Sequence, residues 1–195
     1  MLLMLTATGC TVNSKNEYNP LTQMSFQPVM HIATKASRGL GDYPEGQSFA
    51  INAWTLDKKY NWEEHSSMAA LYLNYEPVHF SKDFGWNIEC GAIWPERGQN
   101  MTVIGYTPVR AFEGCTRENG AVCSYNMLNT QADILYTEPQ ADMDKVESHG
   151  LIVLPFKHAL SQIDFKVKNR VTGNEEIIIK SIKIDEVKYR GYFTS

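Results

Sequence analysis

Cys10 is the residue whose type and position point most directly to a chemistry. Residues 1–10 form an uncharged, largely apolar run that ends at this cysteine, just after the small residues Ala7, Thr8 and Gly9. A secretory signal joins an apolar segment to small residues at its cleavage site, and a cysteine at that site is where a bacterial lipoprotein is acylated. The pattern predicts a signal peptide over residues 1–10 and attachment of lipid, such as palmitate, to Cys10.

The basic segment that usually precedes such an apolar run is missing, which leaves open a start codon upstream of Met1. The alternative interpretation of residues 1–10 is a disordered apolar N-terminus in which the Cys10 thiol is incidental. If Cys10 is lipidated, the protein is exported to a membrane surface. Stable anchoring then needs two or more acyl chains, because each buried methylene contributes only about 0.8 kcal/mol.

Cys115 and Cys123 form the second group, and they flank a segment with a turn signal at Asn119-Gly120. A disulfide between them would close a hairpin, and export permits that bond. Two free thiols in a β-rich core are the alternative. Cys90 is left over and is expected to be a small buried apolar residue.

Acidic residues near a histidine or near each other occur at Glu63-Glu64-His65 and at Asp142 and Asp144. Such groups can serve as general acids and bases, but both clusters fall in polar segments, where solvated charge is the ordinary explanation. The sequence contains no Gly-x-Ser-x-Gly, His-Glu-x-x-His or Cys-x-x-Cys motif and no phosphate-binding glycine loop. The five histidines lack a metal-ligand spacing. We therefore expect no enzymatic activity, no cofactor and no metal site.

The composition is that of a globular chain, with 43% hydrophobic and 21% charged residues among 195. A net charge of −4 provides no basic surplus for nucleic-acid phosphates, so DNA or RNA partners are not expected. After Cys10 no stretch approaches the roughly 18 apolar residues of a membrane-spanning helix. We expect a flexible tether over residues 11–24, because its polar residues cannot bury a core, and one domain over residues 25–195.

The elements that must position these residues read as strands. Residues 49–56 alternate, with Phe49, Ile51 and Ala53 on one side. The other strands are predicted at residues 25–34, 71–75, 86–94, 101–107, 122–128, 132–136, 151–156, 163–168 and 176–184, and one face of residues 163–168 is predicted to be core. Loops are predicted at residues 35–46, 95–100 and 137–150, and a single helical turn at residues 157–162. Many short strands with almost no amphipathic helix indicate an all-β, antiparallel β-sandwich.

Three segments together resemble the fimbrillin-like lipoproteins, which build the type V pili of certain Gram-negative anaerobes. The resemblance covers roughly residues 45–193. It is carried by the following motifs: Phe49-Ala-Ile-Asn-Ala-Trp54; Ile93-Trp-Pro95 followed by Met101-Thr-Val-Ile-Gly-Tyr-Thr-Pro108; and Ala132-Asp-Ile-Leu-Tyr136 leading to Leu154-Pro-Phe-Lys-His-Ala-Leu160 and Ile163-Asp-Phe-Lys-Val167. Each motif also has a structural explanation, in which Trp94 plugs an end of the sandwich and His158 lies at the surface.

The resemblance implies a transthyretin-like Greek-key sandwich that is exported to the outer membrane and the fimbrium. It also implies cleavage by an arginine-specific protease, after which an N-terminal strand leaves and a neighbouring subunit adds its own strand. In this sequence the cleavage site would be Arg38, after the extended segment of residues 25–34. The alternative is that Arg38 is a solvated loop residue. The implied partners are other pilus subunits, the membrane through its lipid anchor, and host or bacterial surface ligands.

The family normally carries a second sandwich domain, and this sequence ends at Ser195, about where that domain would start. We therefore expect either a fragment or a subunit that accepts a strand without donating one. A carbohydrate-binding surface lipoprotein is the competing function. That function requires at least two of Trp54, Trp62, Trp86 and Trp94 to line one exposed, flat patch.

Overall fold

The structure is a computed structural model that describes residues 23–33, 38–88, 91–116, 122–127, 133–160, 165–168 and 178–194. Cys10, most of the predicted tether and Cys90 lie outside the described residues. Gln23 already forms an isolated bridge with Ile93, and Met24 is buried, so regular structure begins just inside the segment predicted as a tether.

The described part of the chain is built mainly from strands, which confirms the predicted all-β class. The strands are β1 (Ser25–Ala33), β2 (Arg38–Asp42), β3 (Phe49–Asp57), β4 (Ala70–Ser81), β5 (Gly85–Ile88), β6 (Gln99–Thr107), β7 (Phe112–Thr116), β8 (Val122–Asn126), β9 (Leu135–Thr137), β10 (Gln140–Met143), β11 (Leu151–His158) and β12 (Arg190–Thr194). The helical elements are short: α1 (Trp62–His65), η1 (Ser66–Met68) and η2 (Val109–Ala111). Among the described residues, no helix combines the length and apolar character needed to cross a membrane.

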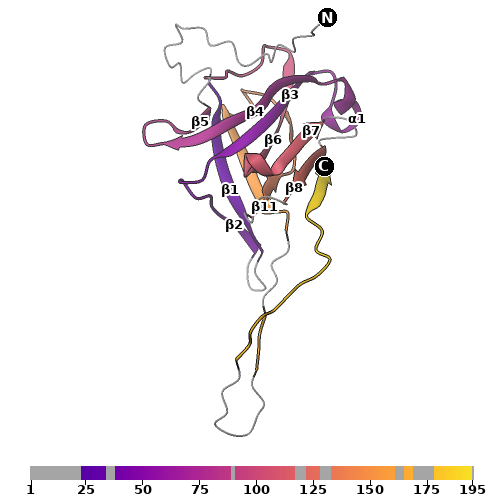
Figure 1. Ribbon diagram of the computed structural model, residues 1–195. Coiled ribbons are helices and arrows are strands. Elements are labelled where there is room, and N and C mark those ends of the chain that lie inside the picture. Colours follow the sequence, from indigo (N-terminus) through magenta and orange to yellow (C-terminus); the bar gives the residue numbers. More distant parts are fainter. Residues whose placement is uncertain are drawn as a thin grey trace, which may run out of the picture.

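Nine strands form one sheet that folds over into two facing layers. The order is β10-β6-β3-β4-β5-β1-β11-β9, β2 pairs with β1, and β9 also pairs with β6. Because β9 pairs with both β11 and β6, the sheet closes on itself and encloses a core (Figure 1). That core is apolar and includes Phe26, Phe49, Val103, Leu154 and Phe156. The antiparallel sandwich is confirmed, with one exception: β1 and β11 are parallel.

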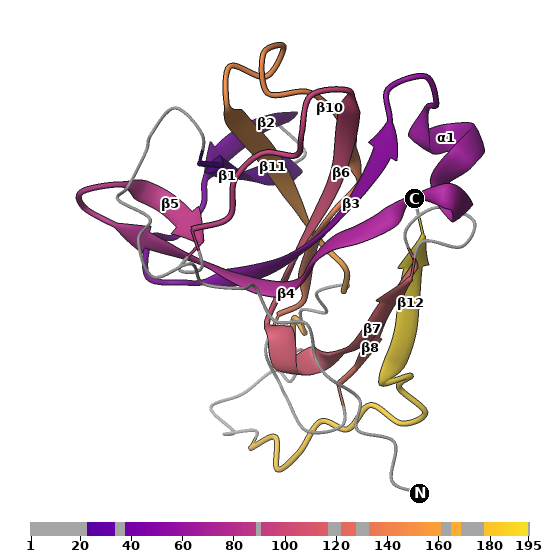
Figure 2. The ribbon, with the colours of Figure 1, turned by 90° about the horizontal axis from the view of Figure 1, so that it is seen from above.

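β3 is buried on both faces because another layer covers its second side. Phe49, Ile51 and Ala53 belong to the first core, while Ala50 and Trp54 belong to a second one. The second core lies against α1 and a three-stranded sheet of order β12-β8-β7. In Figure 2 this small sheet lies on the opposite side of β3 from β1 and β11.

Several predicted boundaries are wrong for a shared reason, which is that pairing partners extend or end strands regardless of local propensity. β11 continues through Lys157 and His158, where a helical turn was predicted, because β9 pairs with these residues. The predicted loops at residues 35–46 and 137–150 contain β2 and β10, which pair with β1 and β6. The strand predicted at residues 86–94 ends at Ile88, and Trp94 is a buried coil residue.

The prediction of a core face in residues 163–168 is also wrong where the structure describes it. Phe165 and Val167 are 54% and 64% exposed, and residues 165–168 lie outside any strand. Residues 178–184, predicted as part of a strand, likewise lie outside any strand and are exposed. We call residues 165–168 and 178–188 the exposed arm. In Figure 1 its yellow part runs far below the sandwich before the chain returns to β12, so no layer of the sandwich faces it.

Candidate site for strand addition

β1 lies between strands from distant parts of the sequence. One edge pairs in parallel with β11, from Ser25↔Leu151 to Met30↔Phe156. The other edge pairs with β2 over residues 29–33 and touches β5 at Phe26↔Trp86. Loss of β1 would therefore leave a slot with unpaired N–H and C=O groups, which is the kind of edge that recruits another strand.

The side chains of β1 alternate between the core and solvent. Phe26 and Pro28 are buried and Met30 packs against the core, whereas Ser25, Gln27 and His31 are exposed. The Phe26 ring meets Phe49 edge-on, with centroids 6.5 Å apart. A strand that occupies this slot must therefore present apolar side chains at every second residue, with room for an aromatic ring at the position of Phe26.

Aromatic rings line the core next to β1. Tyr43 packs against Phe49, Trp86 and Phe156, with ring centroids 4.9 to 5.6 Å apart. Burial raises the pKa of the Tyr43 hydroxyl to about 12, and contact with the Thr107 side chain lowers it only in part. The floor of the slot is thus built to exclude water, which makes it a site for apolar packing.

Arg38 lies at the start of β2, opposite Ala33 at the end of β1. The structure thus places it on a strand of a hairpin, where the sequence predicted a loop. Because Arg38 directly follows the β1–β2 connection, cleavage after it would separate β1 from the rest of the domain.

The two acidic clusters, Glu63-Glu64-His65 and Asp142 with Asp144, lie close together, and their contacts stabilise the fold. Asn61 caps α1 by accepting a hydrogen bond from the Glu64 backbone N–H at 2.8 Å. The Trp62 backbone N–H donates to both carboxylate oxygens of Asp142, at 3.0 Å each. Lys58 forms an ion pair with Asp144, and this contact is the main cause that lowers the pKa of the Asp144 carboxyl. In the described part of the chain, no group of three His, Cys, Asp or Glu residues could hold a metal ion.

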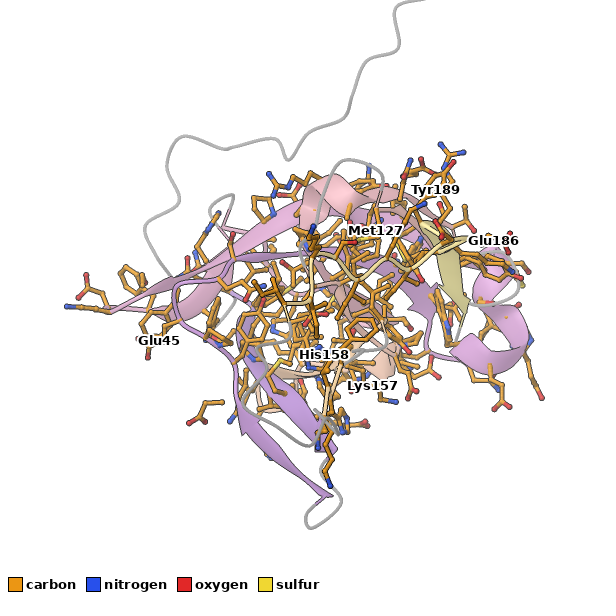
Figure 3. The ribbon with its side chains drawn as sticks, turned by 60° about the horizontal axis from the view of Figure 1, so that its bottom comes forward. Glu45, Met127, Lys157, His158, Glu186 and Tyr189 are labelled. Carbon is orange, nitrogen blue, oxygen red and sulfur yellow. A yellow bond between two sulfur atoms is a disulfide. The ribbon has the colours of Figure 1, made fainter. Side chains whose placement is uncertain are left out.

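His158 lies at the end of β11, beside Lys157 (Figure 3). Its Nδ1 atom is 2.5 Å from an Asp133 carboxylate oxygen, and both side chains are about half exposed. Lys157 forms an ion pair with Glu138. These are surface pairs, which contribute little to stability.

The tryptophans do not form an exposed platform. Trp54, Trp62 and Trp94 are buried, with exposures of 2%, 5% and 5%. Trp86 is half-buried and packs against Phe49 and Phe80. The tryptophan side chains therefore pack in or against the two cores, and the requirement set for carbohydrate stacking is not met.

Cys115 and Cys123 face each other across the β7–β8 hairpin. They are register partners, and the structure joins them as a disulfide with Cα atoms 4.1 Å apart. Cys123 is buried in the second core, and Cys115 packs against it. The cross-strand position explains why a turn signal between two cysteines was the informative pattern in the sequence.

The sequence indicated the extended segment that forms β1 and offered Arg38 as a candidate cleavage residue, but it did not indicate the lining of the slot. The parallel partner β11 and the ring of Tyr43 come from distant segments, and no local pattern marks them. The inward face of β1 was not predicted, and the alternation of Met24, Phe26, Pro28 and Met30 is the sequence signal that could have revealed it.

Comparison with known proteins gives two matches. A family model described as fimbrillin-like matches residues 44–195. The solved structure of a fimbrial protein from Bacteroides vulgatus is similar at 13% sequence identity and a TM-score of 0.48, covering 70% of this chain. This chain spans 45% of the length of that protein, which is less than half. The search of curated protein sequences found no significant match.

Proposed function

The chain belongs to the fimbrillin-like family, and from this premise we propose that it is a structural or adhesive subunit of a pilus at the cell surface. The proposal assigns it no catalytic activity and no cofactor. Its partners are other pilus subunits. Lipidation at Cys10 would tether it to the outer membrane before assembly.

We further propose that assembly proceeds by strand addition at the slot of β1. The observation that carries this step is the placement of β1, which fills the core through alternating residues and is joined to the rest of the domain next to Arg38. Cleavage after Arg38 turns β1 into a separate strand held only by non-covalent contacts. Exchange for a strand of another subunit then keeps the backbone hydrogen bonds and the apolar packing satisfied.

Limited digestion of the purified, folded chain with an arginine-specific protease tests the cleavage step. We expect one early cut, after Arg38, identified by intact mass and N-terminal sequencing. The side chains of Arg97, Arg110 and Arg190 are exposed, so these arginines serve as internal competitors. The matched control is Arg38→Lys, which removes the recognition residue and keeps the charge. Cutting first at Arg97, Arg110 or Arg190, or an unchanged early pattern in Arg38→Lys, would contradict the proposal.

A carbohydrate-binding function is not proposed, because three of the four tryptophans are buried and the fourth, Trp86, is half-buried against the first core. The disulfide between Cys115 and Cys123 is proposed for the exported protein, where the redox conditions allow it to persist.

A further inference from the structure

The exposed arm presents apolar side chains that nothing in the described structure covers. Phe165, Val167, Ile178, Ile182 and Ile184 are 47% to 71% exposed. Among the residues that the structure describes after Leu160, none belongs to either buried core. Exposed aliphatic and aromatic residues gathered on one segment mark a surface that another chain covers.

The first part of the arm has the pattern that the slot of β1 requires. In β1 the inward residues Phe26 and Pro28 are separated by the exposed Gln27. In the arm, Phe165 and Val167 are separated by Lys166. Ile163 precedes Phe165 as Met24 precedes Phe26, so the sequence places an aromatic residue between two apolar ones in both segments.

The charge of Lys168 indicates the register and the chain direction in which residues 165–168 would replace β1. If Phe165 takes the place of Phe26 in the same chain direction, Lys168 takes the place of Val29. Val29 is the cross-strand partner of Asp42 in β2, and the Asp42 side chain is exposed. Lys168 would thus lie opposite a carboxylate on a strand that stays in place after cleavage at Arg38, and opposite charges on paired strands are favourable.

The arm cannot reach this slot in its own molecule. Two parallel neighbouring strands need a crossover of about a dozen residues or more. Only residues 159–164 separate the end of β11 from Phe165. The segment that fills the slot parallel to β11 must therefore come from a second copy.

We propose that residues 165–168 of one copy replace β1 of a neighbouring copy, with Phe165 in the position of Phe26 and Lys168 facing Asp42. This inference rests on the proposed release of β1 and names the strand that takes its place. The chain then both accepts and donates a strand, and copies join head to tail.

Peptide binding to the cleaved chain separates this inference from the proposed function. Labelled peptides of residues 24–30 and of residues 163–169 are added to the full chain after cleavage at Arg38, and fluorescence anisotropy is measured. Both peptides are expected to bind the cleaved chain in a saturable way and the uncleaved chain at least tenfold more weakly. The control peptide, with Phe165→Asp and Val167→Asp, is expected to bind at least tenfold more weakly than the peptide of residues 163–169.

A charge swap tests the register. Asp42→Lys in the protein should weaken the peptide of residues 163–169 by about 1.5- to 5-fold, the range expected for one cross-strand charge pair. Lys168→Asp in the peptide should restore binding to that variant, and the peptide of residues 24–30 should not respond. If the peptide of residues 24–30 binds and the arm peptide does not, the arm is not the donor and the proposed function stands. If neither binds, both fail.

Light scattering of the whole chain tests for the second copy. The cleaved chain is expected to form dimers and larger species, whereas the Phe165→Asp/Val167→Asp double variant stays monomeric after the same cleavage. Lys166→Ser changes an outward residue of the same segment and should assemble like the unsubstituted chain. Equal assembly of the double variant and the unsubstituted chain would overturn the inference.

Discussion

Asn52 is a polar residue at the centre of β3, and it is fully buried. Its Oδ1 atom accepts hydrogen bonds from the Tyr106 hydroxyl at 2.5 Å and the Tyr75 backbone N–H at 3.1 Å. Its Nδ2 group donates to Asn74 at 3.1 Å. The Asn52 side chain thus satisfies polar groups on both neighbouring strands, β4 and β6, and its own buried amide group is satisfied in turn.

Replacement of Asn52 by alanine is expected to lower the free energy of unfolding by about 2–4 kcal/mol. The change leaves the Tyr106 hydroxyl and the Tyr75 amide without their acceptor, and a buried unsatisfied group costs about 1–3 kcal/mol. Urea denaturation measures the effect. Gln99→Ala, at an exposed position of β6 away from this network, is the control and should cost less than about 1 kcal/mol. Adding Tyr106→Phe to Asn52→Ala removes the hydroxyl that lost its acceptor, so it should recover part of the lost free energy of unfolding. No recovery would argue against the hydrogen-bond network around Asn52.

Tyr43 makes the protein sensitive to alkaline pH. Burial raises its pKa to about 12, so the folded state holds the hydroxyl proton more tightly than the unfolded state, where the pKa is about 10. This stabilisation is complete below about pH 10 and is lost as the pH rises toward 12. Burial also raises the pKa of Tyr106, in the same direction. Tyr43→Phe should make the loss of stability above pH 10 less steep, measured as the free energy of unfolding between pH 8 and 11.5. A constant difference between Tyr43→Phe and the unsubstituted chain across this range would contradict the assignment.

At the scale of elements, the β7–β8 hairpin depends on a short closed loop. The disulfide between Cys115 and Cys123 spans a sequence separation of 8. Chain-entropy estimates for a loop of this size give about 2–3 kcal/mol. Ser replacement of both cysteines is expected to lower the stability of the exported protein by that amount.

A reducing agent provides the control for this prediction. Reduced unsubstituted chain should match the double serine variant, and a thiol assay should find no reactive group at these two positions before reduction. Two free thiols at Cys115 and Cys123 in oxidised, folded protein would show that the hairpin is held by packing alone.

β1 differs from the neighbouring strands in how it is paired. One of its two edges pairs in parallel with β11, and parallel pairing is slightly less stable per residue than antiparallel pairing. Its covalent connection to β2 therefore matters for its retention.

At the scale of the whole molecule, the apolar side chains of the exposed arm contact solvent, whereas those of the sandwich are buried in its cores. Ile182→Ser and Ile184→Ser together should change the free energy of unfolding by less than about 1 kcal/mol, because both side chains are about half exposed. Phe156→Ala should cost about 3–5 kcal/mol, since Phe156 is fully buried between the layers. Thermal or urea denaturation of both variants measures the contrast. A large loss in the isoleucine variant would mean that the arm packs against the domain in solution.

The sequence by itself determined the all-β class, most strand positions and the two alternating faces of residues 49–56. These are local properties, because a side-chain period of two and turn residues are written within a few positions of each other. The turn signal between Cys115 and Cys123 and the position of Arg38 after an extended segment were visible for the same reason.

Only the tertiary structure decided which faces are covered. Residues 49–56 and residues 163–168 show the same alternation, yet β3 is buried on both sides and the described part of the other segment is exposed. The difference depends on whether a layer from elsewhere in the chain lies opposite, and burial is a property of that pair of surfaces. The parallel partner of β1, the edge strand β10 and the ring cluster around Tyr43 were hidden from the sequence for the same reason, since each is created by contact between distant segments.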